Sequence, residues 1–334
     1  MRFWMLFATL LAGCASDLRE IPKSCMSLPA AERTSSLAAK GTVTIRDRSI
    51  VNGDKVLAGP FVAIDSFDVS ASRGEVVFSA KRKDNFDIGL VALEGSAIKW
   101  VPEDPADEVA VQWAPRGNKI SYVVRAPGGD LVRTVHIPTA MDLAVTFPWS
   151  RITSLTWDAA AERYTVVYST PDASERSEVA RYGGEDRAIV NAPASRLDVA
   201  IEPVGVDAIV LRPNDLRYDE KLPVVIWIDD ELYAWSDARA SLMRNARVAI
   251  IVSKSANVKL AEPWMDATQT FVVGSAIRPL PSAISFVADP SLPAGRYRES
   301  GRVVAVAPAQ VQSFASCFIA DQLKRTSPTN GSSR

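Results

Sequence analysis

Three consecutive acidic residues form the densest cluster of possible ligand groups in the sequence. Asp229, Asp230 and Glu231 follow directly on the apolar run Leu222–Ile228. Carboxylate oxygens suit hard cations such as Ca²⁺ or Mg²⁺, and the carboxyl end of a buried strand is where α/β folds place ligands. Three adjacent carboxylates cannot all converge on one ion, and no further ligand spacing is evident. The alternative is a solvated loop that caps the following helix, and we predict no metal and no cofactor.

Nucleophilic catalysis would need a serine on a sharp turn and a histidine to activate it. The sequence has no Gly-x-Ser-x-Gly motif, and Gly274-Ser275 is the nearest trace of one. The single histidine, His136, lies in Val135-His-Ile-Pro138, a pattern typical of a strand residue within a repeat. We therefore expect no catalytic triad and predict that the chain is not an enzyme.

The first of three cysteines, Cys14, closes an N-terminal segment with its own chemistry. Arg2 is followed by the apolar run Phe3–Ala12, and the segment ends in Leu11-Ala12-Gly13-Cys14. The run is too short to span a bilayer as a helix. Leu-Ala-Gly-Cys resembles the lipobox of bacterial lipoprotein signal peptides, in which the signal is removed before the cysteine and the cysteine is acylated. A buried N-terminal helix is the alternative.

The lipobox resemblance implies a signal peptide over 1–13, a lipidated tether over 14–40 and a membrane partner through the lipid anchor. Ala15, rather than Asp, implies sorting to the outer membrane, with the body facing the periplasm. Several acyl chains anchor a protein stably without a membrane span. With Cys14 acylated, Cys25 and Cys317 remain in an oxidising compartment, which favours a disulfide between them. Two separate thiols are the alternative.

A repeat of about 45 residues indicates the fold of the middle region. Three segments share an aromatic residue, a polar turn and a strand with a further aromatic residue. They begin at Phe67, Trp113 and Trp157, which are 46 and 44 residues apart. This period matches a four-stranded propeller blade, and each aromatic residue is expected in a core between blades. Closed propellers usually have four or more blades, so either the ring is open or an atypical unit comes from 41–64 or 195–211.

The second repeat supports a family resemblance. The segment from Trp113 to Tyr122, Trp-Ala-Pro-Arg-Gly-Asn-Lys-Ile-Ser-Tyr, resembles the repeat of TolB-like periplasmic propellers and of prolyl oligopeptidase-like enzymes. Leu211–Ile228 is similar to the latter family's approach to its catalytic domain, where His-Gly-Gly helps to form the oxyanion hole. Here Asp229-Asp230-Glu231 follows instead, and acidic side chains repel a developing oxyanion. The resemblance therefore implies a degenerate relative that kept the scaffold and lost the chemistry.

The pattern changes after residue 198, where apolar strands alternate with helices. Strands are expected at 206–213, 222–228, 248–252, 283–287 and 302–307, and helices at 234–246 and 308–324. Such alternation predicts an α/β layer with a mainly parallel sheet. We therefore predict a mixed β plus α/β fold. It comprises a partial or small β-propeller-like domain over 41–198, a short, truncated hydrolase-like α/β domain over 199–325, and a disordered tail over 326–334.

Net charge and motifs together limit the classes of function that the chain could have. The net charge of −1 argues against a nucleic-acid partner. The anchor, the repeat and the missing triad predict a non-catalytic periplasmic lipoprotein that acts as a scaffold for an envelope protein partner. Two alternatives remain open. One is a prolyl oligopeptidase-like hydrolase with unrecognised catalytic residues, and the other is a lipoprotein that binds a small ligand or metal in a cleft between the domains.

Overall fold

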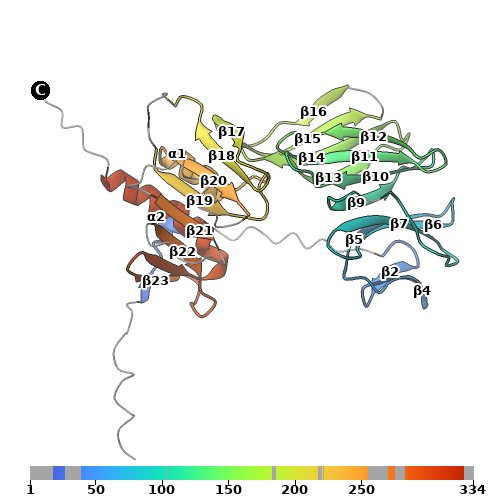
Figure 1. Ribbon diagram of the computed structural model, residues 1–334, viewed down its shortest axis with the longest axis horizontal. Helices are drawn as coiled ribbons and strands as arrows, with labels where there is room; N and C mark the ends of the chain where they lie inside the picture. The colour runs from blue at the N-terminus through green and yellow to red at the C-terminus, as the bar shows by residue number, and fades with distance from the viewer. Residues whose placement is uncertain are drawn as a thin grey trace, which may run out of the picture. The chain divides into compact units, whose positions relative to one another are not determined.

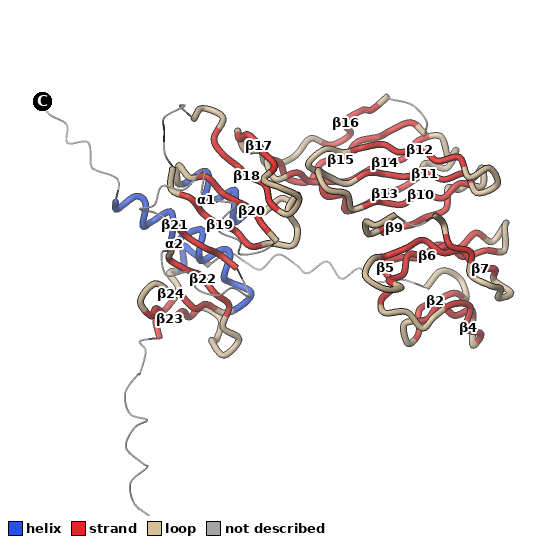
Figure 2. Tube along the Cα trace, in the orientation of Figure 1, coloured by secondary structure: helices blue, strands red, loops and turns tan. Residues whose placement is uncertain are grey.

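The computed structural model describes residues 18–26, 39–102, 104–182, 186–216, 220, 222–254, 270–274 and 283–326. These residues divide into two compact units. The blade unit comprises the described residues of Arg33–Arg196 and Tyr233–Trp235. The sheet unit comprises those of Met1–Glu32, Leu197–Leu232 and Ser236–Arg334. The described chain is mostly β, with several sheets and two α-helices (Figure 2).

Four antiparallel sheets follow one another along the blade unit (Figure 1). The first contains β2 (Val43–Arg46), β3 (Ser49–Asn52) and β4 (Lys55–Ala58). The second contains β5 (Ala63–Ser70), β6 (Glu75–Lys81), β7 (Phe86–Ala92) and β8 (Lys99–Trp100). The third contains β9 (Glu108–Trp113), β10 (Lys119–Val124), β11 (Leu131–His136) and β12 (Met141–Thr146). The fourth contains β13 (Arg151–Trp157), β14 (Arg163–Thr170), β15 (Ala173–Arg181) and β16 (Arg187–Asn191).

The strands of each sheet are paired in chain order, which is the arrangement of a propeller blade. The predicted three-fold repeat therefore corresponds to the second, third and fourth sheets. Of the two candidates for an atypical unit, 43–58 forms the three-stranded first sheet, whereas 199–213 belongs to the sheet unit. β5 begins at Ala63, and Phe61 just before it packs its ring against those of Phe78 and Trp100.

Three apolar cores fill the spaces between consecutive sheets. They join the first and second sheets (Ile50, Phe67), the second and third (Ile88, Trp113), and the third and fourth (Val132, Trp157). The prediction that the three repeat aromatics are core residues is confirmed, since each is at most 8% exposed. Burying a large apolar side chain contributes about 1.5–3 kcal/mol, so each sheet depends on its neighbour for much of its stability.

Polar side chains add a second link between consecutive sheets. β9 lies at one edge of its sheet, and its outward N–H groups need acceptors from elsewhere. The N–H of Ala110 donates to Asp65 Oδ2 at 2.7 Å, and that of Trp113 donates to Asp68 Oδ2 at 2.8 Å. Each pair is separated by 45 residues. The period of the sequence repeat is therefore the spacing between the edge strands of the second and third sheets.

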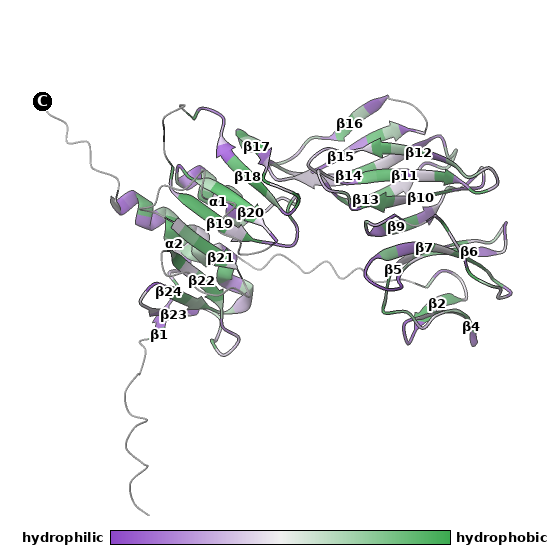
Figure 3. Cartoon of the chain, viewed as in Figure 1, coloured by the Kyte–Doolittle hydropathy of each residue, from purple (hydrophilic) through white to green (hydrophobic). Residues whose placement is uncertain are grey.

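The sheet unit is built around one mixed sheet of nine strands, ordered β1-β23-β24-β22-β21-β19-β20-β18-β17. Its strands are β1 (Leu18–Glu20), β17 (Val199–Pro203), β18 (Ala208–Pro213), β19 (Val224–Ile228), β20 (Ala249–Ser253), β21 (Thr270–Gly274), β22 (Ile284–Ala288), β23 (Arg296–Ser300) and β24 (Val303–Val306). β20, β19, β21, β22 and β24 are parallel. Parallel strands are buried on both faces, which explains their continuous apolar runs, green in Figure 3 for β19 and β21.

Two α-helices accompany this sheet in the described residues. α1 (Asp237–Asn245) begins after Ser236, whose side chain accepts from the N–H of Arg239, as expected of an N-cap. The closing helix starts as the 3-10 turn η3 (Pro308–Gln310) and continues as α2 (Val311–Thr326). Phe314 and Phe318 of α2 pack on Phe286 of β22. None of the described helices is long and apolar enough to cross a membrane.

The strand and helix positions expected after residue 198 are present within a few residues. The described residues do not, however, support the finer prediction of a truncated hydrolase-like α/β domain, because they are mostly β and include only two α-helices. The segment predicted as a tether over 14–40 also differs from the structure. β1 pairs with β23, and the 3-10 turn η1 (Lys23–Cys25) follows it, so part of this segment is folded.

Candidate functional site

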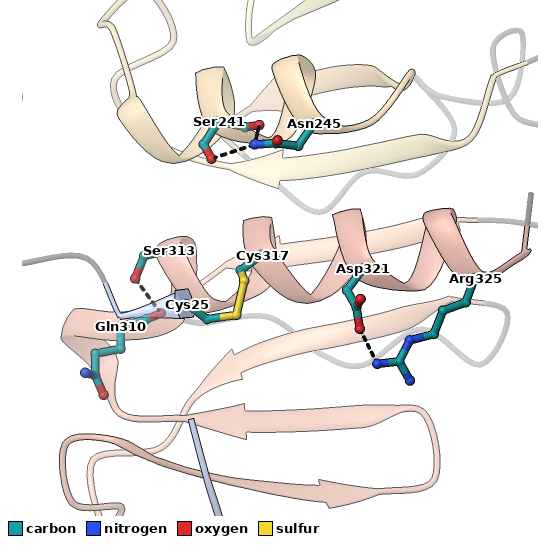
Figure 4. Close-up of a disulfide and its surroundings, with 8 residues drawn as sticks. All are labelled: Cys25, Ser241, Asn245, Gln310, Ser313, Cys317, Asp321 and Arg325. Atoms are coloured by element: carbon teal, nitrogen blue, oxygen red, sulfur yellow. Dashed lines mark hydrogen bonds and ion pairs between the residues drawn. A yellow bond between two sulfur atoms is a disulfide. The ribbon is translucent and has the colours of Figure 1, made fainter. Parts of the chain in front are cut away.

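The predicted disulfide between Cys25 and Cys317 is present (Figure 4). It joins η1 to α2, with the two Cα atoms 5.4 Å apart and the cysteines separated by 292 positions in the sequence. The even number of cysteines left after Cys14 was the signal that pointed to it. Cys14 lies outside the described residues. The bond fixes the N-terminal strand segment to the last helix of the sheet unit.

A groove of about 1100 Å³ runs beside this disulfide. It is lined by polar and apolar side chains of α1, α2, β23 and the N-terminal segment, among them Arg19, Ser241, Asn245, Ser313, Tyr297 and Asp321. Several of these groups bind within their own helix (Figure 4). Asn245 Nδ2 donates to the carbonyl of Ser241 at 2.8 Å, and Arg325 pairs with Asp321 at 2.6 Å. The groove can hold a ligand, but these contacts assemble no nucleophile and base.

Sequence reasoning did not anticipate this groove. Its walls come from the N-terminal segment, α1 and α2, which are separated by more than 200 and about 70 residues along the chain. Patterns in a single sequence report local structure, so long-range approaches of this kind leave no local signal.

The three acidic residues of the first ligand candidate occupy different environments. The N–H of Asp229 donates to the carbonyl of Ser253 at 2.9 Å, which extends the β19–β20 ladder by one residue. Asp229 Oδ1 accepts from the N–H of Glu231 at 3.0 Å, a local turn. Burial raises the pKa of Asp229, while the charge of Arg239 opposes that rise. Asp230, in contrast, is exposed.

Arg239 explains why an acidic residue is useful at position 229. Its side chain is only 2% exposed, and Asp229 supplies charge that counters its burial. A buried cation needs such a partner. Among the described residues, no group of three or more His, Cys, Asp or Glu side chains is placed to hold a metal ion. Asp229 therefore has a structural role in the sheet unit.

His136 and Ser275 are the residues considered for a catalytic base and a nucleophile. His136 ends β11, and its Nδ1 lies 2.7 Å from Thr139 Oγ1. Gly274 ends β21, and Ser275 lies outside the described residues. The His136 ring thus forms a hydrogen bond with a threonine of the following turn.

Glu108, which sequence reasoning missed, is a strongly perturbed carboxyl group of the blade unit. It is fully buried at the start of β9, with Oε2 accepting from the N–H of Ile88 at 3.3 Å. Arg133 Nη1 lies 3.9 Å from Oε1. Burial raises the pKa of Glu108 to about 7, against the lowering effects of Ile88 and Arg133. A perturbed pKa of this kind is one mark of a functional group.

The surroundings of Glu108 favour a structural role. From β9 in the third sheet it contacts the second sheet twice, since its side chain accepts from the N–H of Ile88 in β7 and its carbonyl accepts from Ser79 Oγ in β6. Asp130 has a similar position one sheet further on, since its Oδ2 accepts from the N–H of Ile152 at 2.7 Å and it pairs with Arg125. Both carboxylates link adjacent sheets. Glu108 was not found from the sequence because a charged residue at a strand start is also typical of an exposed loop.

Comparisons with known proteins found only distant structural similarity. No protein-family model matches the chain, and no curated protein matches it. A prolyl endopeptidase, solved in a study of inter-domain dynamics in catalysis and specificity, is similar with a TM-score of 0.46 and 12% identity over 66% of this chain. A protein described as a dipeptidyl aminopeptidase IV from Bacteroides ovatus is similar with a TM-score of 0.49 and 10% identity over 67% of this chain.

This chain matches a minor share of those two peptidases, 36% of the first and 44% of the second. At such low identity and TM-score, the likeness assigns no activity, substrate or catalytic residue to this chain. The function must therefore be argued from the residues of the chain itself.

Proposed function

We propose that this chain is a lipid-anchored protein of the bacterial envelope that binds another protein through the outer edge of its fourth blade sheet and catalyses no reaction. The observation that carries the proposal is β16. All five of its residues are exposed, including Ile189 at 62% and Val190 at 56%.

β16 offers both kinds of contact that an added strand uses. In the described sheets it pairs with β15 on one side, so its other side presents N–H and C=O groups. Exposed edges of this kind are usually blunted by charge or by short length. Here two large apolar side chains stand in the middle of the strand. An extended segment of a partner could pair with the backbone and cover both side chains.

The compartment follows from the cysteines. A disulfide such as Cys25–Cys317 persists in an oxidising compartment such as the periplasm. The lipobox-like segment ending at Cys14 supplies a route to that compartment and an attachment to the membrane. Both features support an outer-membrane lipoprotein that faces the periplasm.

The absence of catalysis is proposed from the roles of the reactive residues. Asp229 is engaged with the buried Arg239 and with the turn to Glu231. Glu108 is enclosed between two sheets, without exposure to a substrate. Their perturbed carboxyl groups are thus accounted for by structure.

The proposal is tested by photocrosslinking the acylated full chain in its own envelope. A photoreactive residue replaces Ile189 in one variant and Val206, which is 70% exposed in the sheet unit, in a second. We expect one abundant adduct from position 189 and none from position 206. The crosslinked protein is identified by mass spectrometry, and its binding is then measured with both proteins purified.

Two substitutions give a matched comparison for that binding. Ile189→Asp should abolish it, whereas Val62→Asp, at an equally exposed position of the same unit, should leave it unchanged. Loss of binding by both variants, or by neither, would reject the β16 edge. Turnover of peptide or ester substrates by the purified chain would reject the non-catalytic role and favour the hydrolase alternative.

The groove beside the disulfide favours one other function, the binding of a small ligand. Its volume of about 1100 Å³ lies just above the upper end of the range of ligand pockets, and its lining is mixed polar and aromatic. If a ligand binds there, an envelope extract should raise the thermal unfolding temperature of the protein. A bulky substitution at the wall of the groove, Ser241→Trp, should abolish that increase. An unchanged increase would exclude this groove.

A further inference from the structure

The lipid anchor and the first folded strand are separated by very little chain. Leu18, the first residue of β1, comes four residues after Cys14. A fully extended chain spans at most about 3.6 Å per residue, so the Cα of Leu18 lies within about 14 Å of that of Cys14. An acylated Cys14 therefore keeps β1 next to the lipid headgroups, whatever conformation the intervening residues adopt.

β1 is also the terminal strand of the nine-stranded sheet. β17 forms the opposite edge, eight strand spacings away. At about 4.8 Å per spacing, the two edges of the sheet are about 38 Å apart. The anchor thus distinguishes one edge of the sheet unit from the other. This asymmetry gives the unit a membrane-proximal side.

Positive charge gathers on that side. β1, η1, β23 and the turn after it contain five basic residues (Arg19, Lys23, Arg296, Arg298, Arg302) and two acidic residues (Glu20, Glu299). The acidic residues pair with two of the five, Glu299 with Arg19 at 2.7 Å and Glu20 with Arg296 at 2.9 Å. Asp289 is influenced by Arg298 and is a third acidic neighbour. A positive excess remains in a chain whose net charge is −1.

Two exposed apolar side chains accompany these charges. Leu18 is 42% exposed and Met26 is 44% exposed, at the two ends of the described N-terminal segment. Basic residues interspersed with exposed apolar ones are the composition of surfaces that lie in a membrane interface.

We propose that the β1 edge of the sheet unit docks on anionic phospholipid headgroups of the membrane that holds the anchor. The inference rests on the proposed acylation of Cys14. It adds an orientation, with the exposed Lys23 and Arg302 toward the lipid and the β17 edge away from it. The occupant is a lipid surface because the chain length to the anchor leaves no room for an intervening protein of ordinary size.

The test measures the distance from the lipid of a fluorophore on the acylated full chain. The chain is reconstituted in vesicles of phosphatidylcholine, with or without phosphatidylglycerol, that carry a headgroup quencher. The fluorophore is attached through Ser300→Cys in one variant and Val206→Cys in another, both exposed and both in the sheet unit. We expect strong quenching at position 300, increased by phosphatidylglycerol, and weak quenching at position 206.

Charge reversals then test the role of the basic residues. Each basic group near an anionic surface changes the ratio of docked to undocked protein about five-fold at low salt. Lys23→Glu with Arg302→Glu should therefore remove the phosphatidylglycerol-dependent part of the quenching at position 300. Lys254→Glu is the matched control, because Lys254 is exposed in the same unit beyond the end of β20. It should leave the quenching unchanged.

Two kinds of failure are distinguishable. The intact mass of the N-terminal peptide reports acylation directly, and a Cys14 without acyl chains would overturn the anchor together with the docking that depends on it. An acylated chain with equal quenching at positions 300 and 206 would overturn the docking alone. Equal effects of the Lys23/Arg302 reversal and of Lys254→Glu would likewise reject the basic surface.

Discussion

The blade unit and the sheet unit bury their β-strands in different ways. In the blade unit, every core lies between sheets that are consecutive in the chain, and the links between β5 and β9 recur at the repeat distance of 45 residues. In the sheet unit, β1 pairs with β23 and Cys25 bonds to Cys317 across almost the whole sequence.

The difference shows which kind of unit can be interpreted from a single sequence. Each blade sheet packs on the next sheet in the chain through the same residue pattern. The period of the blades and their core aromatic residues can therefore be predicted from the sequence. The sheet unit depends on contacts between distant segments, and its N-terminal strand is too short to be recognised by itself. Both segments of the blade unit, Arg33–Arg196 and Tyr233–Trp235, separate segments of the sheet unit along the chain and lie within the loop that the disulfide closes.

The largest expected effects come from removing one buried indole in each unit. Trp113 lies in the core between the second and third blade sheets, and Trp227 is fully buried in β19. Trp→Ala substitutions in cores cost about 3–5 kcal/mol. Trp113→Ala should therefore destabilise the blade unit and Trp227→Ala the sheet unit, as measured by hydrogen exchange of peptides from β6 and from α2. Loss of protection in both units from either change would show that they unfold as one.

Breaking the disulfide should affect one unit selectively. We expect Cys25→Ser with Cys317→Ser to lower the free energy of unfolding of the sheet unit by about 2–5 kcal/mol, because the N-terminal segment is no longer fixed to α2. Urea unfolding followed by hydrogen exchange separates the two units. The blade unit should keep its midpoint.

Reduction of the natural chain by a thiol is the control for that double variant. It should reproduce the loss in the sheet unit, since the described structure places both cysteines there. An equal loss of stability in the blade unit would contradict the expectation that the disulfide affects the sheet unit selectively.

Glu108 gives the blade unit a pH dependence. Its pKa is raised from 4.5 to about 7, so between these values the folded chain holds a proton that the unfolded chain has released. Stability from this group is therefore greatest below about pH 4.5 and falls as the pH rises to about 7, by up to about 3 kcal/mol. Glu108→Gln removes the charge, so it should stabilise the blade unit at pH 8 by up to that amount. Its effect near pH 5 should be much smaller.

Urea midpoints of the blade unit at pH 5 and pH 8 measure this difference. Glu94→Gln, at an exposed position of the same unit, is the matched control and should change neither midpoint. A Glu108→Gln chain that keeps the natural pH slope would show that burial of this carboxyl group does not cause it.

The candidate site was only partly predictable. The disulfide followed from the cysteine count and the compartment, and the core aromatics followed from the repeat. The acidic run after β19 was recognised as a strand-end cluster, but its partner Arg239 was not, because the partner lies on the next helix and is buried by the tertiary fold. The groove beside the disulfide and the burial of Glu108 were missed for the same reason.

The sequence by itself indicated the period of the blade repeat, the apolar strands of the sheet unit, a helix over 234–246, and a Cys25–Cys317 disulfide as one of two alternatives. These follow from periodicity and residue counts, which act over a few residues or over composition. The tertiary structure alone decided that Leu18–Glu20 forms the edge of a nine-stranded sheet. It also decided that the charge of Asp229 counters the burial of Arg239, and that the side chain of Glu108 is buried away from solvent. The physical reason is that burial and pairing are set by neighbours distant in the chain, and only folding brings those neighbours together.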